Sequence, residues 1–483
     1  FGTDYQTHRG SGYAGWGGEG RRPRIKKMGS GQFKDKFEDD YLAMRAMGDR
    51  ARYGLGAIGD TEQPLICDSH HGTYVLATTG RILNEKGLVR KLIKNHGASF
   101  TEVSTDGENR STVHNPTEIA SKLINLGRDL EDGVRILQEE IEGSISGVMM
   151  KEGEGIYAFN GTHWPLILGE KEEGWAVTTE TCAFPNLGFE ERKHLSPGEM
   201  VHFNQEGYEV LTEPHGPSQI CTFLWVYTGF PASNYMGINA GLARERCGAA
   251  LAKRDFITPD FVAGVPDSGN YHAMGCAMEM GIPYRMPLTK YTPSQGRSYT
   301  APEQWMRDLI AKMKLIPIDE MLKGYSWLFN EDSIVRNTQL RMFTLNKIFG
   351  VPLEVPDGVG VDELFGAGAR EVHIRPACPP LLFACNFGKS VLRKEELVAR
   401  RAVVALEGRD ISDEELRERG YLDPESKNFE MMINWIRDDL DSMVKAGPKR
   451  LTLMYQRLDD MIEAIGVPEE RVCTYCWNGK KAA

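Results

Sequence analysis

Long apolar runs, basic charge and cysteine are all scarce in this sequence, and each shortage excludes a class of protein. No segment offers the roughly 18 uninterrupted apolar residues that a membrane-spanning helix needs, so no membrane partner is expected. Asp and Glu (68) outnumber Lys and Arg (57), and the net charge of -11 argues against a broad nucleic-acid-binding surface but allows a local cationic pocket. The nine cysteines and the lack of a recognisable secretory leader predict reduced thiols or metal ligands in a cytoplasmic protein rather than a disulfide framework.

The length and composition of the chain predict two domains and a smaller appendage. Its 483 residues are too many for one core, and 41% apolar with 26% charged residues is typical of globular proteins. Residues 1–31 are Gly-rich, which favours a solvated loop, and they carry a basic cluster at Arg21, Arg22, Arg24, Lys26 and Lys27.

Residues 65–211 have the pattern of an antiparallel α+β domain. A helical stretch over 116–126 interrupts short β-rich runs that are separated by turns. The clearest runs are 73–77, 156–159, 175–178 and 200–203. The longest apolar run of the chain follows, near 221–230, and it predicts a buried strand.

Beyond Phe230 the pattern changes to alternating helices and strands, which is typical of a parallel sheet covered by helices. An Ala-rich helix is expected at 241–253, and strands are expected at 261–265, 325–329 and 371–374. Ser412 and Glu415 form a capping-box pattern that opens a mostly helical tail. In that tail Ile433, Ile436, Leu440 and Met443 share one helical face, which predicts core packing before the helix ends at Gly447 and Pro448.

The segment 325–340, YSWLFNEDSIVRNTQL, predicts a ribose and phosphate site. Two acids, Glu331 and Asp332, follow an apolar strand and precede a polar turn into a helical segment over 339–349. Carboxylates at the carboxyl end of a parallel strand can hold ribose hydroxyls or Mg²⁺, while turn amides and Thr338 can hold a phosphate. An ordinary acidic loop between a strand and a helix is the alternative that composition leaves open.

Cys473 and Cys476 form a CxxC pair near the end of the chain. By itself this spacing fits half a zinc site, a redox pair or chance.

The segment EDSIVRNT (331–338) resembles the loop that binds phosphoribosyl pyrophosphate (PRPP) in the glutamine amidophosphoribosyltransferase family, which usually reads DDSIVRGTTS. Upstream, GVPDSG (264–269) matches the family's pyrophosphate loop, Lys290 and GRSY (296–299) resemble the loop that closes over PRPP, and REVHIRPACPP (370–380) resembles the following strand. The resemblance implies Mg²⁺ ligation by Ser268, Glu331 and Asp332. It implies PRPP binding by Asp267, Ser268, Gly269, Lys290, Glu331, Asp332, Ser333, Arg336, Asn337 and Thr338. Asn337 stands where the family has Gly, and Gln339 and Leu340 stand where it has Thr and Ser.

The same resemblance gives the cysteines a role. Cys473 and Cys476, in the segment 462–480, match the terminal ligands of a [4Fe-4S] cluster in the cluster-containing branch of the family, and the other two ligands map onto Cys221 and Cys385. A structural role is expected for this cluster. The other thiols are expected to be buried and free: Cys67, Cys182, Cys247, Cys276 and Cys378.

The glutamine half resembles the family with departures. THRGSGYAG (7–15), the stretch 63–84 and ETCA (180–183) follow family landmarks, and Arg52 maps onto the arginine that grips the glutamine carboxylate. Gly80 is kept at the oxyanion hole, but Thr79 replaces the oxyanion Asn and Pro116 replaces an Asp that holds the substrate amine. The family's nucleophile is an amino-terminal Cys about twenty residues before the HRG segment, and only seven residues precede His8 here.

The resemblance therefore implies α/β and α+β architecture in three parts. An amino-terminal nucleophile (Ntn) hydrolase-type αββα glutaminase domain is expected over 1–225, a type I phosphoribosyltransferase domain with a parallel sheet over 226–400, and a helical tail over 401–483. The implied reaction transfers ammonia, from glutamine or free, to PRPP to give phosphoribosylamine for purine synthesis. Purine nucleotides are expected as regulators, and the protein is expected to be a homo-oligomer. The alternative is a non-catalytic or regulatory paralogue that binds PRPP or a nucleotide.

Overall fold

The chain forms two compact units, which are described one at a time. The first runs to Cys221 and includes residues 234–236 and 386–389, and the second contains the rest. The computed structural model describes residues 10–17, 24–29, 51–59, 61–105, 112–204, 207–214, 216, 218–290, 315–336, 348, 368–387, 393–444 and 450–480. The expectations for Gly447, Pro448 and most of 339–349 lie outside this part of the chain. The side chain of Met443 lies outside it as well.

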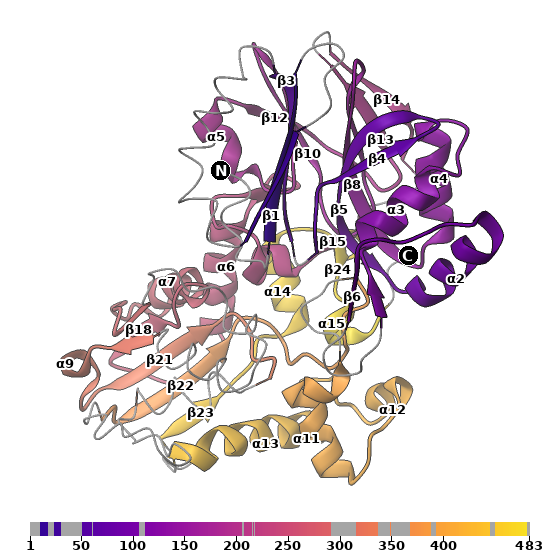
Figure 1. Ribbon diagram of the computed structural model, residues 1–483. Coiled ribbons are helices and arrows are strands. Elements are labelled where there is room, and N and C mark those ends of the chain that lie inside the picture. The colour runs from indigo at the N-terminus through magenta and orange to yellow at the C-terminus, as the bar shows by residue number, and fades with distance from the viewer. Residues whose placement is uncertain are drawn as a thin grey trace, which may run out of the picture. The chain divides into compact units, whose positions relative to one another are not determined.

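The first unit is built on a six-stranded antiparallel sheet in the order β14-β13-β9-β8-β5-β4 (Figure 1). Its strands are β4 Leu65–Ser69, β5 Gly72–Ile82, β8 Gly143–Lys151, β9 Gly155–Phe159, β13 Met200–Phe203 and β14 Tyr208–Thr212. The short β-rich runs expected from the sequence at 73–77, 156–159 and 200–203 all lie in this sheet.

Two three-stranded antiparallel sheets accompany it. One has the order β11-β10-β12, from β10 Ile167–Lys171, β11 Gly174–Thr178 and β12 Glu190–His194. The other has the order β2-β1-β3, from β1 Gly10–Gly17, β2 Arg24–Gly29 and β3 Ala51–Gly59. The solvated loop expected over 1–31 is therefore wrong where the structure describes it, because β1 pairs with both β2 and β3 and so forms a sheet even from a Gly-rich segment that has little β propensity.

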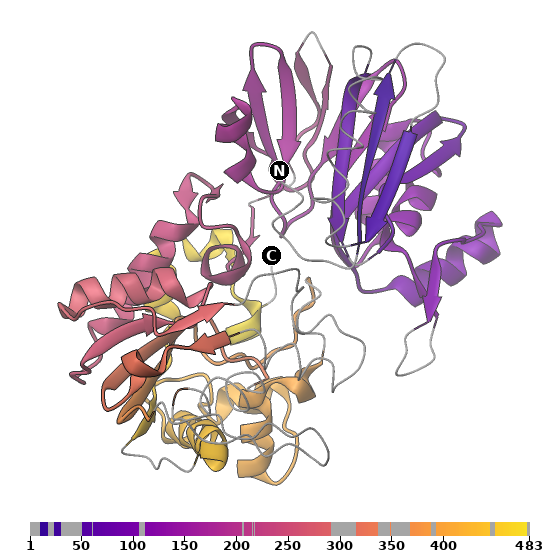
Figure 2. The same cartoon turned by 60° about the vertical axis from the view of Figure 1, so that its left-hand side comes forward.

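The sheets and helices of this unit stack in the order helix, sheet, sheet, helix (Figure 2). The helices α2 Glu85–His96, α3 Pro116–Ile124 and α4 Leu130–Glu140 bury Leu88, Leu123 and Val134 against one face of the six-stranded sheet. On the opposite face the sheet packs against β3 and β10 through Leu55 and Leu168. Phe184 of α5 (Phe184–Leu187) then covers β10, where a Cβ on Gly169 would lie 2.7 Å from its ring. The αββα arrangement expected for the first domain is confirmed.

The second unit has a four-stranded parallel sheet in the order β18-β21-β22-β23. Its strands are β18 Phe261–Gly264, β21 Ser326–Glu331, β22 Glu371–Pro376 and β23 Leu451–Leu453. Helices α6 Ala240–Ala252 and α7 Gly269–Met280 cover one face, with Ala273 packed on Val262, and α11 Val398–Glu407 and α13 Lys427–Val444 cover the other (Figure 1). Because both faces are covered, the central strands β21 and β22 are buried along almost their whole length, and the parallel sheet expected from the sequence is confirmed.

The helical tail follows its capping and periodicity signals. Ser412 and Glu415 form a complete capping box at the start of α12 Asp413–Glu418. In α13, Ile436 and Leu440 are buried in the core and Ile433 packs beside them.

The remaining short elements are η1 Thr181–Ala183, β6 Val103–Thr105, β7 Thr112–His114, β15 Ile220–Cys221, β16 Asn234–Tyr235, β17 Ile238–Asn239, β19 Leu288–Lys290, β20 Leu315–Pro317, α9 Asp319–Leu322, η5 Lys394–Glu396, α14 Leu458–Ile465, η6 Glu469–Arg471, β24 Val472–Cys473 and α15 Tyr475–Asn478.

The apolar run at 221–230 is not a buried strand as expected. After Cys221 the chain turns into a π-helix, η2 Leu224–Thr228, with Trp225 and Val226 fully buried. Periodicity cannot separate a buried strand from a buried helical turn in so short a run. Side chains from two helices decide the outcome, because Arg244 donates to the carbonyls of Trp225 (2.7 Å) and Gly229 (2.6 Å) and His272 contacts that of Val226 (3.0 Å).

Within the described residues, the helices all fall short of the length and apolar character needed to cross a membrane.

Candidate active site

The loop after β18 folds back tightly at the amino terminus of α7. The Val265 N–H donates to the Asn330 carbonyl (2.9 Å), and the Gly269 N–H donates to the Val265 carbonyl (3.0 Å), so the loop folds back beside the end of β21. A Cβ on Gly269 would lie 2.3 Å from the Asn330 oxygen, which requires glycine there. The peptide bond between Pro266 and Asp267 is cis. The first amides of the twelve-residue α7 then face the loop, which is where helices bind anions.

Two acids lie at the carboxyl end of β21, next to this loop. Glu331 ends the strand, and its carbonyl accepts the Ala377 N–H (2.8 Å) that follows β22. Asp332 is buried, and one of its carboxylate oxygens accepts a hydrogen bond from the Ser333 hydroxyl (2.7 Å). Burial raises the pKa of the Cys378 thiol well above its usual value, and the charge of Asp332 raises it further. This sheet edge thus carries both the tight loop after β18 and the two acids Glu331 and Asp332.

Lys290 reaches the same edge from β19. Its ammonium lies 2.6 Å from a carboxylate oxygen of Asp267, whose side chain is two-thirds exposed. An exposed pair of this kind is worth little to stability, so Lys290 is available to exchange Asp267 for an anionic ligand.

Arg336 is held by α11 and the turn before it. Its guanidinium pairs with Glu396 (Nε to Oε2, 2.6 Å), its carbonyl accepts from Arg401 (3.1 Å), and the Val398 N–H donates to the Val335 carbonyl (2.8 Å).

The structure thus brings seven of the sequence-predicted PRPP residues to one edge of the parallel sheet, and Arg336 ends the same loop. The seven are Asp267, Ser268, Gly269, Lys290, Glu331, Asp332 and Ser333. Asn337, Thr338, Gln339, Leu340 and the segment 296–299 lie outside the described residues.

Sequence reasoning missed the side chains that brace this edge from beneath. Arg375 of β22 and Asp255 form an ion pair in which both side chains are only 4% exposed, with Nη2 to Oδ1 at 3.2 Å. Arg375 also donates to the Thr452 hydroxyl (3.0 Å). These partners lie 77 to 120 residues apart in the sequence, so no local pattern could have indicated them.

The segments that carry three of the predicted cluster cysteines lie together in the second unit. The Leu382 and Phe383 N–H groups donate to the Cys476 carbonyl (3.0 and 3.1 Å), just before Cys385. The Thr222 hydroxyl donates to the Cys473 carbonyl (2.7 Å), and Thr222 follows Cys221 directly. Burial raises the pKa of Cys473 to about 11, and the charge of Cys385 raises it further. Among the described residues, however, no three His, Cys, Asp or Glu side chains converge as a formed metal site.

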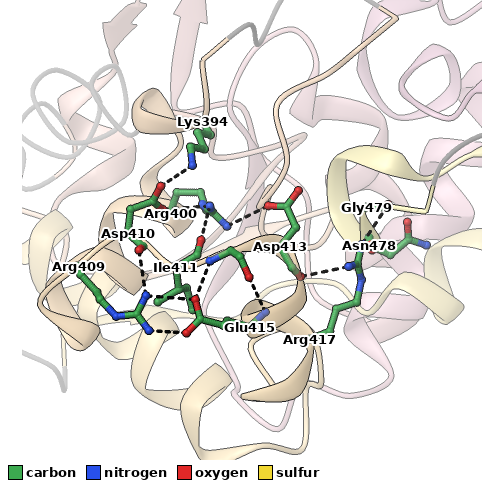
Figure 3. Close-up of polar contacts among 11 residues, drawn as sticks. Lys394, Arg400, Arg409, Asp410, Ile411, Asp413, Glu415, Arg417, Asn478 and Gly479 are labelled. Carbon is green, nitrogen blue, oxygen red and sulfur yellow. Dashed lines mark hydrogen bonds and ion pairs between the residues drawn. The ribbon is translucent and has the colours of Figure 1, made fainter.

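Helix α12 clamps the end of this cysteine segment (Figure 3). Arg417 donates to the carbonyls of Asn478 (3.4 Å) and Gly479 (3.1 Å), and its guanidinium lies 5.6 Å from the centre of the Phe383 ring. Beneath the helix the buried Arg400 donates to Asp410 (3.0 Å) and to the Ile411 carbonyl (2.9 Å).

Two acids around the start of α12, Asp410 and Glu415, are held in their ionised form by neighbouring basic side chains. A hydrogen bond from Lys394 lowers the pKa of Asp410, and one from Arg409 lowers the pKa of Glu415 to about 2. Both carboxylates therefore stay ionised and paired at neutral pH.

In the first unit the glutamine-site residues lie where β5 meets α3. The hydroxyls of Thr78 and Thr117 are 2.7 Å apart, and Gln63 accepts from the Thr78 N–H (3.0 Å) and the Thr117 hydroxyl (3.2 Å). This network, which sequence reasoning missed, sets Thr79 and Gly80 near Pro116.

The other two predicted glutamine-site residues, Pro116 and Arg52, lie on α3 and β3. Pro116 occupies the first position of α3, where its missing N–H costs nothing. Arg52 lies on β3, and its side chain is outside the described part.

A cavity of about 380 Å³ opens elsewhere on this unit, between β4 and α3, and is lined in part by Cys67, Glu118 and Lys122. Its lining shares no residue with either candidate site. The remaining predicted free thiols, Cys67, Cys182, Cys247, Cys276 and Cys378, are buried as expected.

Fold and site together define a class: an Ntn-hydrolase-type αββα unit in one chain with an α/β unit that carries a type I phosphoribosyltransferase loop and acid pair. No protein-family model matches the chain. The amidophosphoribosyltransferase of Bacillus subtilis (strain 168) is 30% identical over 411 residues, covering 83% of this chain and 80% of that protein. The amidophosphoribosyltransferase of Archaeoglobus fulgidus is 29% identical over 391 residues, covering 80% of each.

Among solved structures, the chain is similar to the glutamine PRPP amidotransferase of B. subtilis complexed with ADP and GMP. The TM-score is 0.73 at 25% identity, over 98% of this chain and 90% of that one. The chain belongs to the amidophosphoribosyltransferase family.

Proposed function

We propose that this protein transfers ammonia, released from glutamine or taken free, to PRPP and so forms phosphoribosylamine for purine synthesis. The observation that carries the proposal is the meeting of the loop over 264–269 with Glu331 and Asp332 at one sheet edge. The names of the curated relatives agree with it. They do not favour the alternative of a non-catalytic paralogue.

In the proposed reaction the ammonia nitrogen bonds to C1 of the ribose while the C1–O bond to pyrophosphate breaks, and the new amine then loses a proton. The amides at the start of α7 and the Lys290 ammonium stabilise the charge on the leaving pyrophosphate. Glu331 and Asp332 hold the ribose hydroxyls, which fixes C1 opposite the incoming nitrogen. A Mg²⁺ ion on Ser268, Glu331 and Asp332 would supply further charge neutralisation to the pyrophosphate.

Calorimetric titration of PRPP in the presence of Mg²⁺ tests this assignment. We expect the wild-type protein to bind PRPP and the Asp332→Ala variant to bind at least about tenfold more weakly, because a charged hydrogen-bonding group is worth about 1.5–3 kcal/mol. Glu320→Ala, an exposed acid on α9 of the same unit, is the matched control and should bind normally. Equal binding by Asp332→Ala and wild type would overturn the assignment.

We also propose that Cys221, Cys385, Cys473 and Cys476 hold a structural [4Fe-4S] cluster. Four thiols are the donor set that such a cluster needs. Hydrogen bonds join the segment just before Cys385 to the Cys476 carbonyl, and Thr222, the neighbour of Cys221, to the Cys473 carbonyl. Since the side chains do not converge by themselves, binding would require the thiols to turn toward the cluster.

Protein purified without oxygen should contain about four iron atoms per chain. Cys473→Ser should lose most of that iron, whereas Cys276→Ser, at a buried thiol in the core of the second unit, should keep it. Zinc, or no metal at all, in the wild-type protein would refute the cluster.

The remaining expectations stay predictions. The B. subtilis structure contains ADP and GMP, which supports regulation by purine nucleotides. The homo-oligomer and the cytoplasmic location stay predictions without further support.

A further inference from the structure

Helix α3 of the first unit has an apolar face and a polar stripe. Ile119, Leu123 and Ile124 are fully buried in the core against the six-stranded sheet. The polar stripe follows the helical spacing i, i+3, i+4 and i+7, and it lines the cavity of about 380 Å³ between α3 and β4. Its members are Glu118, Ser121, Lys122 and Asn125. The volume lies within the range of small-molecule sites, roughly 300–1,000 Å³.

The α3 wall of this cavity has hydrogen-bond donors to spare. The Glu118 carboxylate is already occupied, because it accepts from the N–H (2.9 Å) and the hydroxyl (3.0 Å) of Thr101. The Lys122 ammonium lies 4.0 Å from that carboxylate, too far for a hydrogen bond, and it makes none with the described residues. Asn125 accepts the Tyr74 hydroxyl (2.8 Å) through Oδ1, which leaves its amide N–H groups. Lys122 and Asn125 can therefore hold an anionic group.

The negative end of α3 does not cancel this donor pair, because other groups cover it. In the turn between β4 and β5, the His71 ring donates to the Ile124 carbonyl (3.3 Å) and the His70 ring to the Gly127 carbonyl (2.9 Å). The Ile124 carbonyl also accepts the Gly127 N–H (3.1 Å). With these carbonyls satisfied, the helix dipole opposes an anion near Asn125 less strongly.

The β4 side of the cavity supplies a carboxylate and an apolar surface. Asp68 lines the cavity, and only its Oδ1 atom accepts the Thr73 hydroxyl (2.9 Å). Glu102 adds a second carboxylate to the lining. Leu65 and Cys67 give the lining apolar surface, and burial raises the pKa of Cys67 to about 11, so its thiol is uncharged at neutral pH. Donors for an anion, an acceptor for a cation and an apolar surface thus meet in one cavity.

We propose that this cavity binds a free α-amino acid with an apolar side chain of about the size of leucine. Lys122 and Asn125 hold the carboxylate of the ligand, and Asp68 holds its ammonium group. The side chain of the ligand lies against Leu65 and Cys67. A ligand with only one charge leaves one of the charged protein groups unpaired, so the cavity selects a zwitterion. Its lining shares no residue with the predicted glutamine and PRPP sites, so it can be occupied independently of both.

Calorimetric titration of the full chain with leucine and two analogues tests the proposal. The oxo acid α-ketoisocaproate lacks the ammonium group, isoamylamine lacks the carboxylate, and both keep the side chain. Leucine should bind with a dissociation constant on the order of millimolar or below, and each analogue should bind about tenfold or more weakly. Binding of either analogue as tightly as leucine, or no binding of leucine, would overturn the proposal.

Three variants locate the bound leucine. Lys122→Met, which keeps the length of the side chain, should weaken leucine about tenfold and abolish the preference for leucine over isoamylamine. Asp68→Asn, which still accepts from Thr73, should abolish the preference over the oxo acid. Lys94→Met, at an exposed lysine of α2 outside the cavity, is the matched control and should bind like wild type.

Thermal melting shows whether each variant is folded, which we expect because Lys122 and Asp68 are both partly exposed. Folded Lys122→Met that binds leucine with the affinity and preference of wild type would place leucine elsewhere and overturn the proposal. The proposed transfer to PRPP would stand in that case, because the titration involves neither PRPP nor glutamine.

Discussion

At the scale of single residues, His272 shows how burial makes a side chain sensitive to acid. Its ring is fully buried beside the Arg244 guanidinium, and burial with that charge lowers its pKa from 6.5 to about 3. Below pH 6.5 the unfolded chain takes up a proton that the folded protein excludes, so the contribution to stability is lost as the pH falls from 6.5 toward 3.

We therefore expect His272→Gln to reduce the pH dependence of stability. Gln keeps a donor for the Val226 carbonyl but does not titrate. The fall in unfolding free energy between pH 7 and pH 5 should be smaller than in wild type by about 2 kcal/mol. Urea unfolding at the two pH values measures it, and identical pH dependence in both proteins would show that His272 titrates normally.

Gly80 is a second residue whose identity is dictated by its surroundings. It has a φ of +125°, and a Cβ there would lie 2.0 Å from the Ser144 carbonyl oxygen on the neighbouring strand. Gly80→Ala should destabilise the first unit by about 2–4 kcal/mol, from backbone strain and overlap together. Gly153→Ala is the matched control, because Gly153 also has a positive φ, of 73°, but has open space around it. A similar loss of stability in both variants would show that the strands move apart enough to accept the Gly80→Ala methyl group without a measurable loss of stability.

At the scale of elements, α12 depends on its cap. The Ser412 hydroxyl accepts the Glu415 N–H (3.1 Å), and the Glu415 carboxylate accepts the Ser412 N–H (3.0 Å). Ser412→Ala should cost about 1 kcal/mol of unfolding free energy. It should also increase amide exchange at residues 478–479, because Arg417 on the same helix binds their carbonyls. Ser442→Ala on the exposed face of α13 should change neither measurement. If the amides of residues 478–479 stay protected in Ser412→Ala, the contact of Arg417 with these residues does not depend on the cap of α12.

At the scale of the whole molecule, the two half-sites are predicted to differ in activity. The transferase edge keeps both acids and the glycine loop, whereas the glutamine site has Thr79 and Pro116 where an oxyanion donor and a carboxylate belong. Losing one oxyanion donor costs on the order of a hundredfold in rate, and Pro116 has neither charge nor N–H to offer the substrate amine.

We expect protein with its native amino terminus to form phosphoribosylamine with ammonia but to release glutamate from glutamine slowly. Glutamate release should be assayed with and without PRPP, and ammonia-dependent product formation in the same preparation is the control. Rapid glutamate release stimulated by PRPP would show that the glutamine site is intact.

The sequence alone determined the features whose physical cause is local. Hydrophobic period and capping identified β5, β9, β13, β18, β21 and β22, and with them α6, α12 and α13, because side-chain spacing and the Ser412 cap act within a few residues. The acid pair after β21 and the glycine loop before α7 were also visible, since a phosphate site needs those residue types in a row. The Gly-rich strands β1 and β2 were missed, because glycine has little β propensity and β1 is paired not only with β2 but also with the distant strand β3.

Only the tertiary structure decided what depends on partners far along the chain. The run at 221–230 is a π-helix because Arg244 and His272 bind its carbonyls, and the edge of the parallel sheet is braced by the pair Arg375 and Asp255. Within the described part of the chain, His163 is buried with no hydrogen-bond partner for either ring nitrogen, and this too becomes visible only when burial and neighbours are known. A sequence records residue types and spacing, but the cost of an unpaired polar atom is set by which distant atoms fold around it, so such a site is decided in three dimensions.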